Sequence, residues 1–101
     1  MNLKKETMEL IESLGINVVA YKLVNLTDWW NTQVFKGEGE INWEEIPSNL
    51  LNYDKGYGTQ YWEGIILLSN NTWLTRSEYR GKEWWEHHKL PTIEEVLNTN
   101  F

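Results

Sequence analysis

The side chains in this sequence that could do chemistry are mainly aromatic rings with arginines among them. The 101-residue chain contains seven tryptophans, five tyrosines and two phenylalanines. Tryptophan, tyrosine and arginine are the residue types that most often anchor protein interfaces, and an arginine beside aromatic rings can also hold a flat anion such as a nucleotide. The candidate binding residues are Trp29, Trp30, Tyr57, Arg76, Arg80, Trp84 and Trp85.

The adjacent tryptophans cannot all point into one core. Successive side chains of a β-strand point to opposite faces, so Trp29 and Trp30 diverge, and so do Trp84 and Trp85. Aromatic rings also dominate the cores of small proteins, and core packing explains the tryptophan content as well as ligand contact does. We expect at least one ring of each pair to lie at an edge, under a loop or in a binding surface.

Tyr57 lies between two glycines, in a stretch that is typical of a flexible turn. This stretch lacks the lysine and the helix start of a phosphate-binding loop. The functional alternative is a lid that closes Tyr57 over a flat ligand, with Arg76 and Arg80 supplying positive charge to bind an anion.

Neither a metal site nor a catalytic group is expected. His87 and His88 would diverge on a strand, whereas a structural metal site needs about four converging ligands. The candidate for a perturbed carboxylate is a pair of like charges, Glu63 and Glu78, predicted to face each other across a hairpin. No serine or threonine has a neighbouring histidine pattern that would activate it. The sequence therefore favours a protein without enzyme activity and without a cofactor.

Length and composition indicate one small globular domain over residues 1–101. The absence of cysteine excludes disulfides and favours a cytoplasmic protein. No apolar run reaches the roughly 18 residues of a membrane span, so no membrane contact is expected. The net charge of −6 argues against direct nucleic-acid binding, which needs clustered lysine and arginine.

Charge is unevenly distributed along the chain. Between Glu38 and Glu63 there are six acidic residues against one base, Lys55. Between Arg76 and Lys89 there are four bases against three acidic residues. Solvated loops and strand edges explain the acidic segment, and an acidic surface that docks a basic partner is the alternative.

The first half of the chain predicts a helix followed by a buried strand. Apolar side chains recur at helical spacing over residues 3–14, and Gly15 follows where helices commonly end. Residues 16–26 are rich in β-branched side chains and apolar on both faces, which predicts an interior strand. A hairpin is expected about the glycine-containing turn 36–40. A short helical turn follows at 46–51, with Ser48 or Asn49 as its cap.

Residues 61–90 predict an antiparallel meander of three strands. Asn70 and Asn71 suit a two-residue turn, because asparagine tolerates positive φ. A second turn at Arg80 and Gly81 leads into the third strand. The first turn fixes a register with Leu68 opposite Trp73, Ile66 opposite Thr75 and Leu67 opposite Leu74.

The end of the chain predicts a last helix. Thr92 and Glu95 have the spacing of a capping box, and Val96 and Leu97 are expected to face inward. The predicted fold class is therefore α+β. It consists of an antiparallel sheet, made of the meander 61–90 and strand 16–26, with an N-terminal and a C-terminal helix packed on it.

Residues 64–86 resemble a hairpin module of small uncharacterised proteins from tailed bacteriophages. The shared features, in order, are a strand, a tight turn, a Trp-Leu-x-Arg step from Trp73, Glu-Tyr-x-Gly from Glu78 and Glu-Trp-Trp from Glu83. The resemblance covers about a quarter of the chain and implies no activity. It implies a phage-encoded protein in the host cytoplasm, in a class whose members often disable host machinery or sequester a host signal.

Two binding functions are left open, beside a third function as a hydrolase that would use Glu63 or Glu78. In the first, a non-enzymatic accessory protein binds and inhibits a host protein through aromatic side chains and an acidic surface. In the second, the protein binds or sequesters a nucleotide-like anion between tryptophans, with Arg76 contacting the charge. A homo-oligomer is compatible with both.

Overall fold

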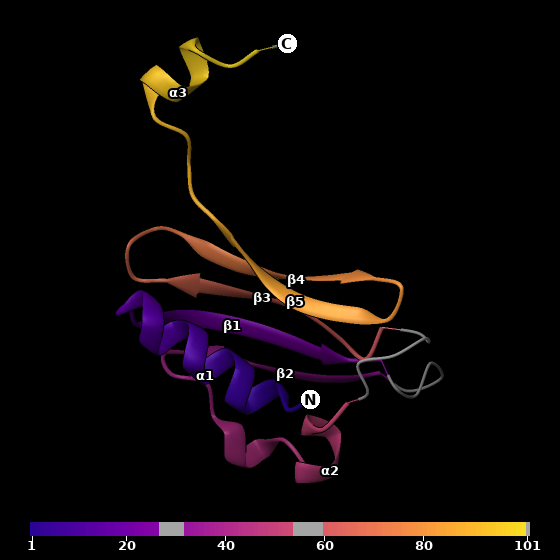
Figure 1. Cartoon of the computed structure of the whole chain (residues 1–101). Helices are drawn as coiled ribbons and strands as arrows, with labels where there is room; N and C mark the ends of the chain where they lie inside the picture. The colour runs from indigo at the N-terminus through magenta and orange to yellow at the C-terminus, as the bar shows by residue number, and fades with distance from the viewer. Residues whose placement is uncertain (27–31, 54–59, 101) are drawn as a thin grey trace.

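The computed structural model describes residues 1–26, 32–53 and 60–100. Over these ranges the chain is an α+β fold, and the predicted fold class is confirmed (Figure 1). Its elements, in chain order, are α1 (Leu3–Leu14), β1 (Val18–Asn25), β2 (Gln33–Glu38), the 3-10 helix η1 (Trp43–Glu45), α2 (Ser48–Leu51), β3 (Trp62–Leu68), β4 (Trp73–Tyr79), β5 (Lys82–His88) and α3 (Ile93–Leu97).

The first helix has the bounds that the sequence predicts. Asn2 caps its start, because the side-chain oxygen accepts a hydrogen bond from the backbone N–H of Lys5 at 3.0 Å. Gly15 ends it in the left-handed conformation, with φ of 65°, and donates its N–H back to the carbonyls of Ile11 and Glu12. Leu3 and Thr7 are buried, so the helix packs through one face.

The described strands form an antiparallel sheet in the order β2-β1-β3-β4-β5. The interior position predicted for the first strand is confirmed, because β1 pairs with β2 on one side and with β3 on the other. The meander is confirmed as well: β3, β4 and β5 are consecutive neighbours. Since β1 lies beside β3, residues far apart in sequence meet in the middle of the sheet.

The hairpin predicted about residues 36–40 is wrong. Strand β2 continues through Gly37 to Glu38 and pairs along its length with β1. A Cβ atom at Gly37 would lie 3.1 Å from the Tyr21 hydroxyl, so this glycine admits the tyrosine ring instead of forming a turn. The chain turns later, at Gly39, where φ is 82°, and goes on to η1.

The register between β3 and β4 differs by one residue from the predicted one. Leu67 lies opposite Trp73, Ile66 opposite Leu74 and Ile65 opposite Thr75. The loop has three residues, because Leu68 donates its N–H to the carbonyl of Thr72 and Asn71 donates to the carbonyl of Leu68. Only Asn71 has positive φ, 64°, which is typical of a three-residue hairpin loop.

The side chain of Asn70 explains this choice of turn. Its oxygen accepts from the backbone N–H of Thr72 at 3.2 Å and from the Thr72 hydroxyl at 2.5 Å. Such a local bond holds the chain in a turn. In the resulting register Ile66 and Leu74 share the buried face, which a two-residue loop would not allow.

The second turn of the meander forms where the sequence predicts it. Arg80 and Gly81 have φ of 53° and 83°, and the flanking Tyr79 and Lys82 are paired. Two successive residues with positive φ are typical of a type I′ turn between twisted strands. The third strand then runs from Lys82 to His88.

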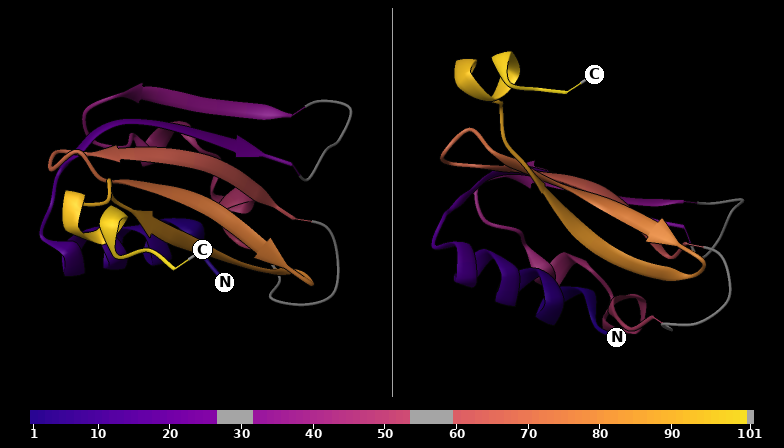
Figure 2. Two further views of the ribbon diagram at one scale, coloured as in Figure 1. Left: turned by 90° about the horizontal axis from the view of Figure 1, so that it is seen from above. Right: turned by 45° about the horizontal axis from the view of Figure 1, so that its top comes forward.

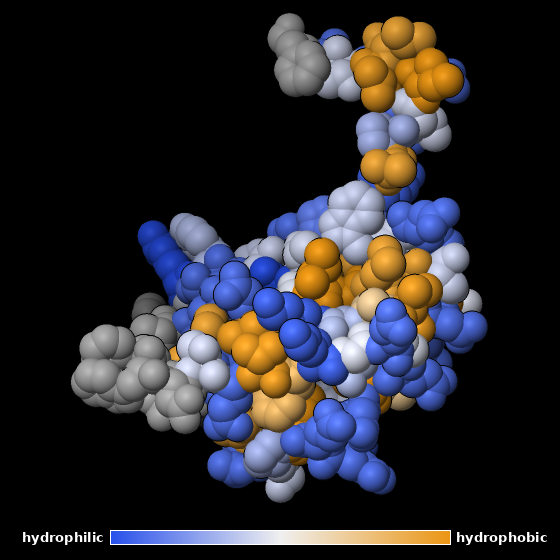
Figure 3. Space-filling model, turned by 180° about the vertical axis from the view of Figure 1, so that it is seen from behind, coloured by the Kyte–Doolittle hydropathy of each residue, from blue (hydrophilic) through white to orange (hydrophobic). Residues whose placement is uncertain are grey.

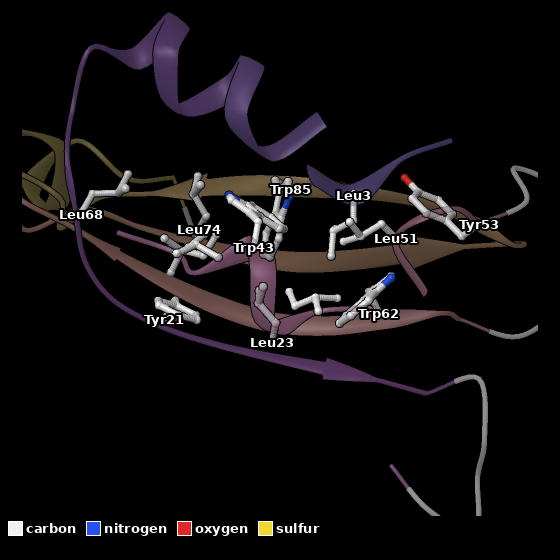
Figure 4. Close-up of a cluster of buried hydrophobic side chains, with 13 residues drawn as sticks. Leu3, Tyr21, Leu23, Trp43, Leu51, Tyr53, Trp62, Leu68, Leu74 and Trp85 are labelled. Atoms are coloured by element: carbon white, nitrogen blue, oxygen red, sulfur yellow. The ribbon is translucent and has the colours of Figure 1, made fainter. Parts of the chain in front are cut away.

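One face of the sheet is covered by α1, η1 and α2 (Figure 2). We call this the covered face, and Figure 4 shows the core that fills it. The short helix α2 begins after Pro47 and has no side-chain cap, so the predicted cap at Ser48 or Asn49 is wrong. The buried apolar side chains described are Leu3, Tyr21, Leu23, Ile41, Trp43, Ile46, Leu51, Tyr53, Trp62, Ile66, Leu68, Leu74 and Trp85.

The last helix does not pack on the sheet. Thr92 caps α3 as predicted, its side chain accepting from the N–H of Glu95. However, Val96 and Leu97 are exposed, and α3 stands clear of the sheet on the side away from α1 (Figures 1 and 2). A capping box fixes where a helix starts, whereas docking depends on distant surfaces, so the predicted inward orientation is wrong. Among the described residues, no helix is long and apolar enough to span a membrane.

Gly64 lies at a position in β3 where there is no room for a side chain. A Cβ atom there would lie 2.8 Å from the backbone oxygen of Lys22 and 3.4 Å from the ring of Trp85. We expect Gly64→Ala to lower the free energy of unfolding by about 1–3 kcal/mol, because the strands or the ring must shift. Denaturant unfolding of wild type and Gly64→Ala measures this difference in the free energy of unfolding. As the control, Glu63→Ala on the exposed face should stay within about 0.5 kcal/mol of wild type.

Candidate binding surface and its buried support

The second face of the sheet is not covered by any helix of the described chain, and we call it the open face. Strand register brings its side chains into rows. One row is Ala20, Leu67, Trp73 and His88, and the next is Lys22, Ile65, Thr75 and Glu86. Apolar side chains in both rows are partly exposed: Ile65 by 48% and Leu67 by 43%. A contiguous apolar surface of this kind is typical of an interaction site.

Trp84 and Trp85 lie on opposite faces, as the sequence predicts. Trp84 is on the open face, opposite Ser77, and is 38% exposed, whereas Trp85 is on the covered face and 9% exposed. The indole N–H of Trp85 donates to the hydroxyl of Thr7 in α1 at 2.8 Å. Trp84 is therefore partly exposed to solvent, whereas Trp85 helps to hold α1 on the sheet.

Trp73 extends the aromatic part of the open face. Its ring stacks on that of His88, with centroids 5.6 Å apart and an interplanar angle of 19°. The same histidine is held by Thr75, 2.6 Å from its Nε2. His87 points to the other side and contacts the Thr72 hydroxyl at 2.8 Å. The two histidines diverge as expected, and no group of three potential metal ligands occurs in the described ranges.

Arg76 is buried on the covered face, where it forms the centre of a polar network. Its Nη1 is 2.6 Å from Glu6 Oε1, and its Nε is 3.2 Å from Glu83 Oε1. Its Nη2 donates to the Tyr53 hydroxyl at 2.8 Å. The guanidinium also lies over the rings of Tyr53 and Trp85, 5.3 and 5.2 Å from their centroids. With its side chain fully buried, Arg76 is placed to support the fold and not to contact a nucleotide.

Glu83 is the buried carboxylate that sequence reasoning missed. It accepts the backbone N–H groups of Tyr61 at 2.5 Å and Trp62 at 3.0 Å, in addition to the Arg76 ion pair. Strand alternation provided a signal: Arg76 shares a face with the buried Leu74, and Glu83 with the buried Trp85. A charge on the apolar face of each of two neighbouring strands indicates a buried ion pair.

The like-charge pair predicted between Glu63 and Glu78 is wrong, because the register differs. Glu63 lies on the open face opposite Val24 of β1. Glu78 lies opposite Glu83 of β5, and its carboxylate accepts the N–H of Gly81 at 2.8 Å. The two carboxylates therefore belong to different faces of the sheet.

The remaining sequence candidates are dispersed or lie outside the described residues. Arg80 is exposed in the β4–β5 turn, with its guanidinium 5.3 Å from the Tyr79 ring centroid. The acidic segment does not gather on one face, since Glu38 ends β2, Glu44 lies in η1 and Glu63 is on β3. The candidates outside the described ranges are Trp29, Trp30 and Tyr57, together with Asp54 of the acidic segment.

Helix α3 adds a second exposed apolar surface. Ile93 is 81% exposed, Leu97 77% and Val96 56%. Figure 3 shows apolar side chains gathered in this part of the chain, separate from the body of the protein. Glu95 in the same helix is within 3.9 Å of Lys89, an exposed pair that contributes little to stability. The apolar side chains of α3 are thus available to a partner.

Comparison of the chain with known proteins gives no matching family model, no matching curated protein and no matching solved structure.

Burial and the ion pairs shift two pKa values in the network. Burial raises the pKa of the Tyr53 hydroxyl to about 12, and the hydrogen bond that it donates to Glu6 acts in the same direction. Nearby Arg76 opposes this increase. Burial alone would lower the pKa of Arg76, but the hydrogen bond and the charge of Glu6 outweigh it and raise that pKa. The network therefore favours a neutral Tyr53 and a charged Arg76.

The shift at Tyr53 predicts a loss of stability at high pH. A group whose pKa is raised in the folded state stabilises the fold below its ordinary pKa, here 10.0. That contribution is lost as the pH rises through the folded value of about 12. We expect Tyr53 to account for a decrease of about 2–3 kcal/mol in the free energy of unfolding over this range.

Denaturant unfolding of wild type and Tyr53→Phe between about pH 8 and about pH 12 isolates this contribution. The phenylalanine variant should be less sensitive to pH than wild type. Tyr79→Phe is the matched control, because Tyr79 is exposed, and it should keep the wild-type dependence. Equal pH dependence in all three proteins would contradict the assignment.

Proposed function

We propose that this protein is a non-enzymatic binding protein that docks another protein on its open face and α3. The observation that supports this most strongly is the exposure of Trp84, Ile65 and Leu67 on the side of the sheet that no described helix covers. Tryptophan at the centre of an interface commonly contributes a large share of the binding energy. Trp84 lies on the edge strand β5 opposite Ser77, on the same face as Ile65 and Leu67 of β3.

Charged side chains border the apolar part of the open face. Lys22 lies opposite Ile65, and Glu86 lies opposite Thr75, while Lys82 begins β5. This arrangement of an apolar centre with a charged border is typical of protein interfaces. The charges set which partner fits, and the apolar centre supplies most of the affinity.

We further propose a host protein as the partner and inhibition as the outcome. The support for this part is the resemblance of residues 64–86 to a hairpin module of small phage proteins, whose class often disables host machinery. The hairpin in question includes Trp73 and Trp84, which both lie on the open face. Occupation of a partner's working surface would be sufficient for inhibition, and no catalytic step is required.

Substitution of Trp84 tests the open face. Trp84→Ala is expected to weaken binding at least about 30-fold, which corresponds to about 2 kcal/mol for an interface tryptophan. The free energy of unfolding should change little, because the indole lies outside the covered core. Capture of the partner from bacterial lysate, followed by titration calorimetry with the purified partner, measures the effect.

Met8→Ala is the matched control for this experiment. Met8 is 47% exposed but belongs to α1, which covers the opposite face of the sheet. Its substitution should leave the affinity unchanged. If Trp84→Ala and Met8→Ala bind equally well, the open face is not the docking surface.

A double substitution in α3 tests the second surface. Ile93→Asp with Leu97→Asp should leave the free energy of unfolding within about 0.5 kcal/mol of wild type per substitution, because both side chains are exposed. The same change should weaken partner binding, since charge would replace apolar contacts. Glu94→Gln, in the same helix, is the control and should bind as wild type does. Unchanged affinity of the double variant would limit the interface to the sheet.

A further inference from the structure

Strand β5 forms one edge of the described sheet, and its outer side has no strand beside it. It pairs with β4 alone, and no other backbone hydrogen bond within the described ranges involves its residues. Helix α3 and the segment before it leave the sheet on the side away from α1 (Figures 1 and 2). Along an edge strand the N–H and C=O groups of alternate residues point away from the sheet. These groups of β5 are therefore open to pairing with another strand.

The outer edge of β5 is better suited to pairing than the other edge of the sheet. Strand β5 contains no proline, and its register with β4 continues without a shift from one end to the other. The other edge strand, β2, has Lys36 and Gly37 in its interior, and both residue types weaken edge pairing. An inward charge such as Glu83 usually discourages pairing, but this carboxylate is already paired with Arg76. A second strand beside β5 would therefore bury no unpaired charge.

The side chains that β5 places on the open face complement a second copy of the same strand. When two copies pair antiparallel with both open faces on one side, the pairing must be centred on one residue. Centred on Trp84, it puts Lys82 of each copy opposite Glu86 of the other and the two Trp84 rings together at the centre. Centred on Glu86, it would oppose two carboxylates. Opposite charges and aromatic pairs stabilise antiparallel neighbours, whereas like charges destabilise them, so the register about Trp84 is favoured.

We propose that two copies of this chain associate through β5, which pairs antiparallel about Trp84 and joins the two sheets into one. Lys82 is exposed and has no ion pair within the described ranges, so it is free to meet Glu86 of the second copy. The contact is symmetric, and each charge pair therefore occurs twice. It uses the edge of the sheet and not the open face, so it goes beyond the docking of a host protein and does not require one.

Sedimentation equilibrium of the full chain measures this association. Wild type should form a dimer whose fraction rises with protein concentration. Lys82→Glu and Glu86→Lys each replace both ion pairs with pairs of like charge, and each should weaken the dimer at least about tenfold. Both positions are exposed, so both variants should fold as wild type does. A wild-type protein that stays monomeric up to about 1 mM would overturn the proposal.

An equal mixture of Lys82→Glu and Glu86→Lys tests the register. In a mixed pair one copy carries acids at both positions and the other carries bases, so both contacts between opposite charges are restored. The mixture should dimerise about as tightly as wild type, and native mass spectrometry with one variant ¹⁵N-labelled identifies the mixed dimer. Since the wild-type net charge is −6, both variants stay acidic, and general attraction cannot account for this recovery. A mixture that dimerises as weakly as its components would overturn the register about Trp84.

Lys36→Glu is the matched control. Lys36 is exposed on β2, at the opposite edge of the sheet, and its reversal changes the net charge as much as Lys82→Glu does. This variant should dimerise as wild type does. Equal weakening by Lys36→Glu, or a dimer lost only in the double variant Ile93→Asp with Leu97→Asp, would contradict pairing through β5. Because sedimentation uses the protein alone, the result does not depend on whether a host protein binds the open face.

Discussion

The ion pair between Arg76 and Glu83 constrains the rest of the structure. Both side chains are fully buried, and an unpaired buried charge costs several kcal/mol, so removing either partner is expected to cost about 3–5 kcal/mol. Arg76 therefore requires Glu6 from α1 and Tyr53 from the segment after α2 in addition to Glu83. Glu83 in turn requires the backbone N–H groups at the start of β3. One guanidinium thus fixes elements that are up to 70 residues apart in sequence.

This constraint also decides which face of the sheet is covered. Since Glu6 must reach Arg76, α1 has to lie over the face to which Arg76 points, and Thr7 then meets the indole N–H of Trp85. The absence of a side chain at Gly64 leaves room for the Trp85 ring beneath the helix. Strand alternation places Trp84 and Trp73 on the opposite face, away from α1. The polar network inside therefore determines which aromatic rings remain outside, although it does not contact them.

The sequence predicted the features that depend on local patterns and missed those that depend on pairing between distant segments. The first helix, its glycine end, the interior strand and the Arg80-Gly81 turn all follow from residues close together in the chain. The predicted β3–β4 register was wrong because the Asn70 side chain favours a three-residue loop. The Asn-Asn pair alone does not reveal this loop length. The alternation that separates Trp84 from Trp85 was predictable. Arg76 was assigned to anion binding and Glu83 to no role, because a buried ion pair requires both partners to be placed at once.

The exposed aromatic and apolar side chains have no role in the core that this network organises. Trp84 and Ile65 lie on the open face, and Leu97 projects from a helix that contacts neither face of the sheet. Small monomeric proteins seldom expose such groups together, because apolar surface in water is unfavourable and promotes association. In this fold their exposure cannot be relieved by α1, which Arg76 and Glu6 hold on the other side. A partner that covers the open face and α3 would remove this surface from water without disturbing the buried network, and on this basis we propose binding as the function.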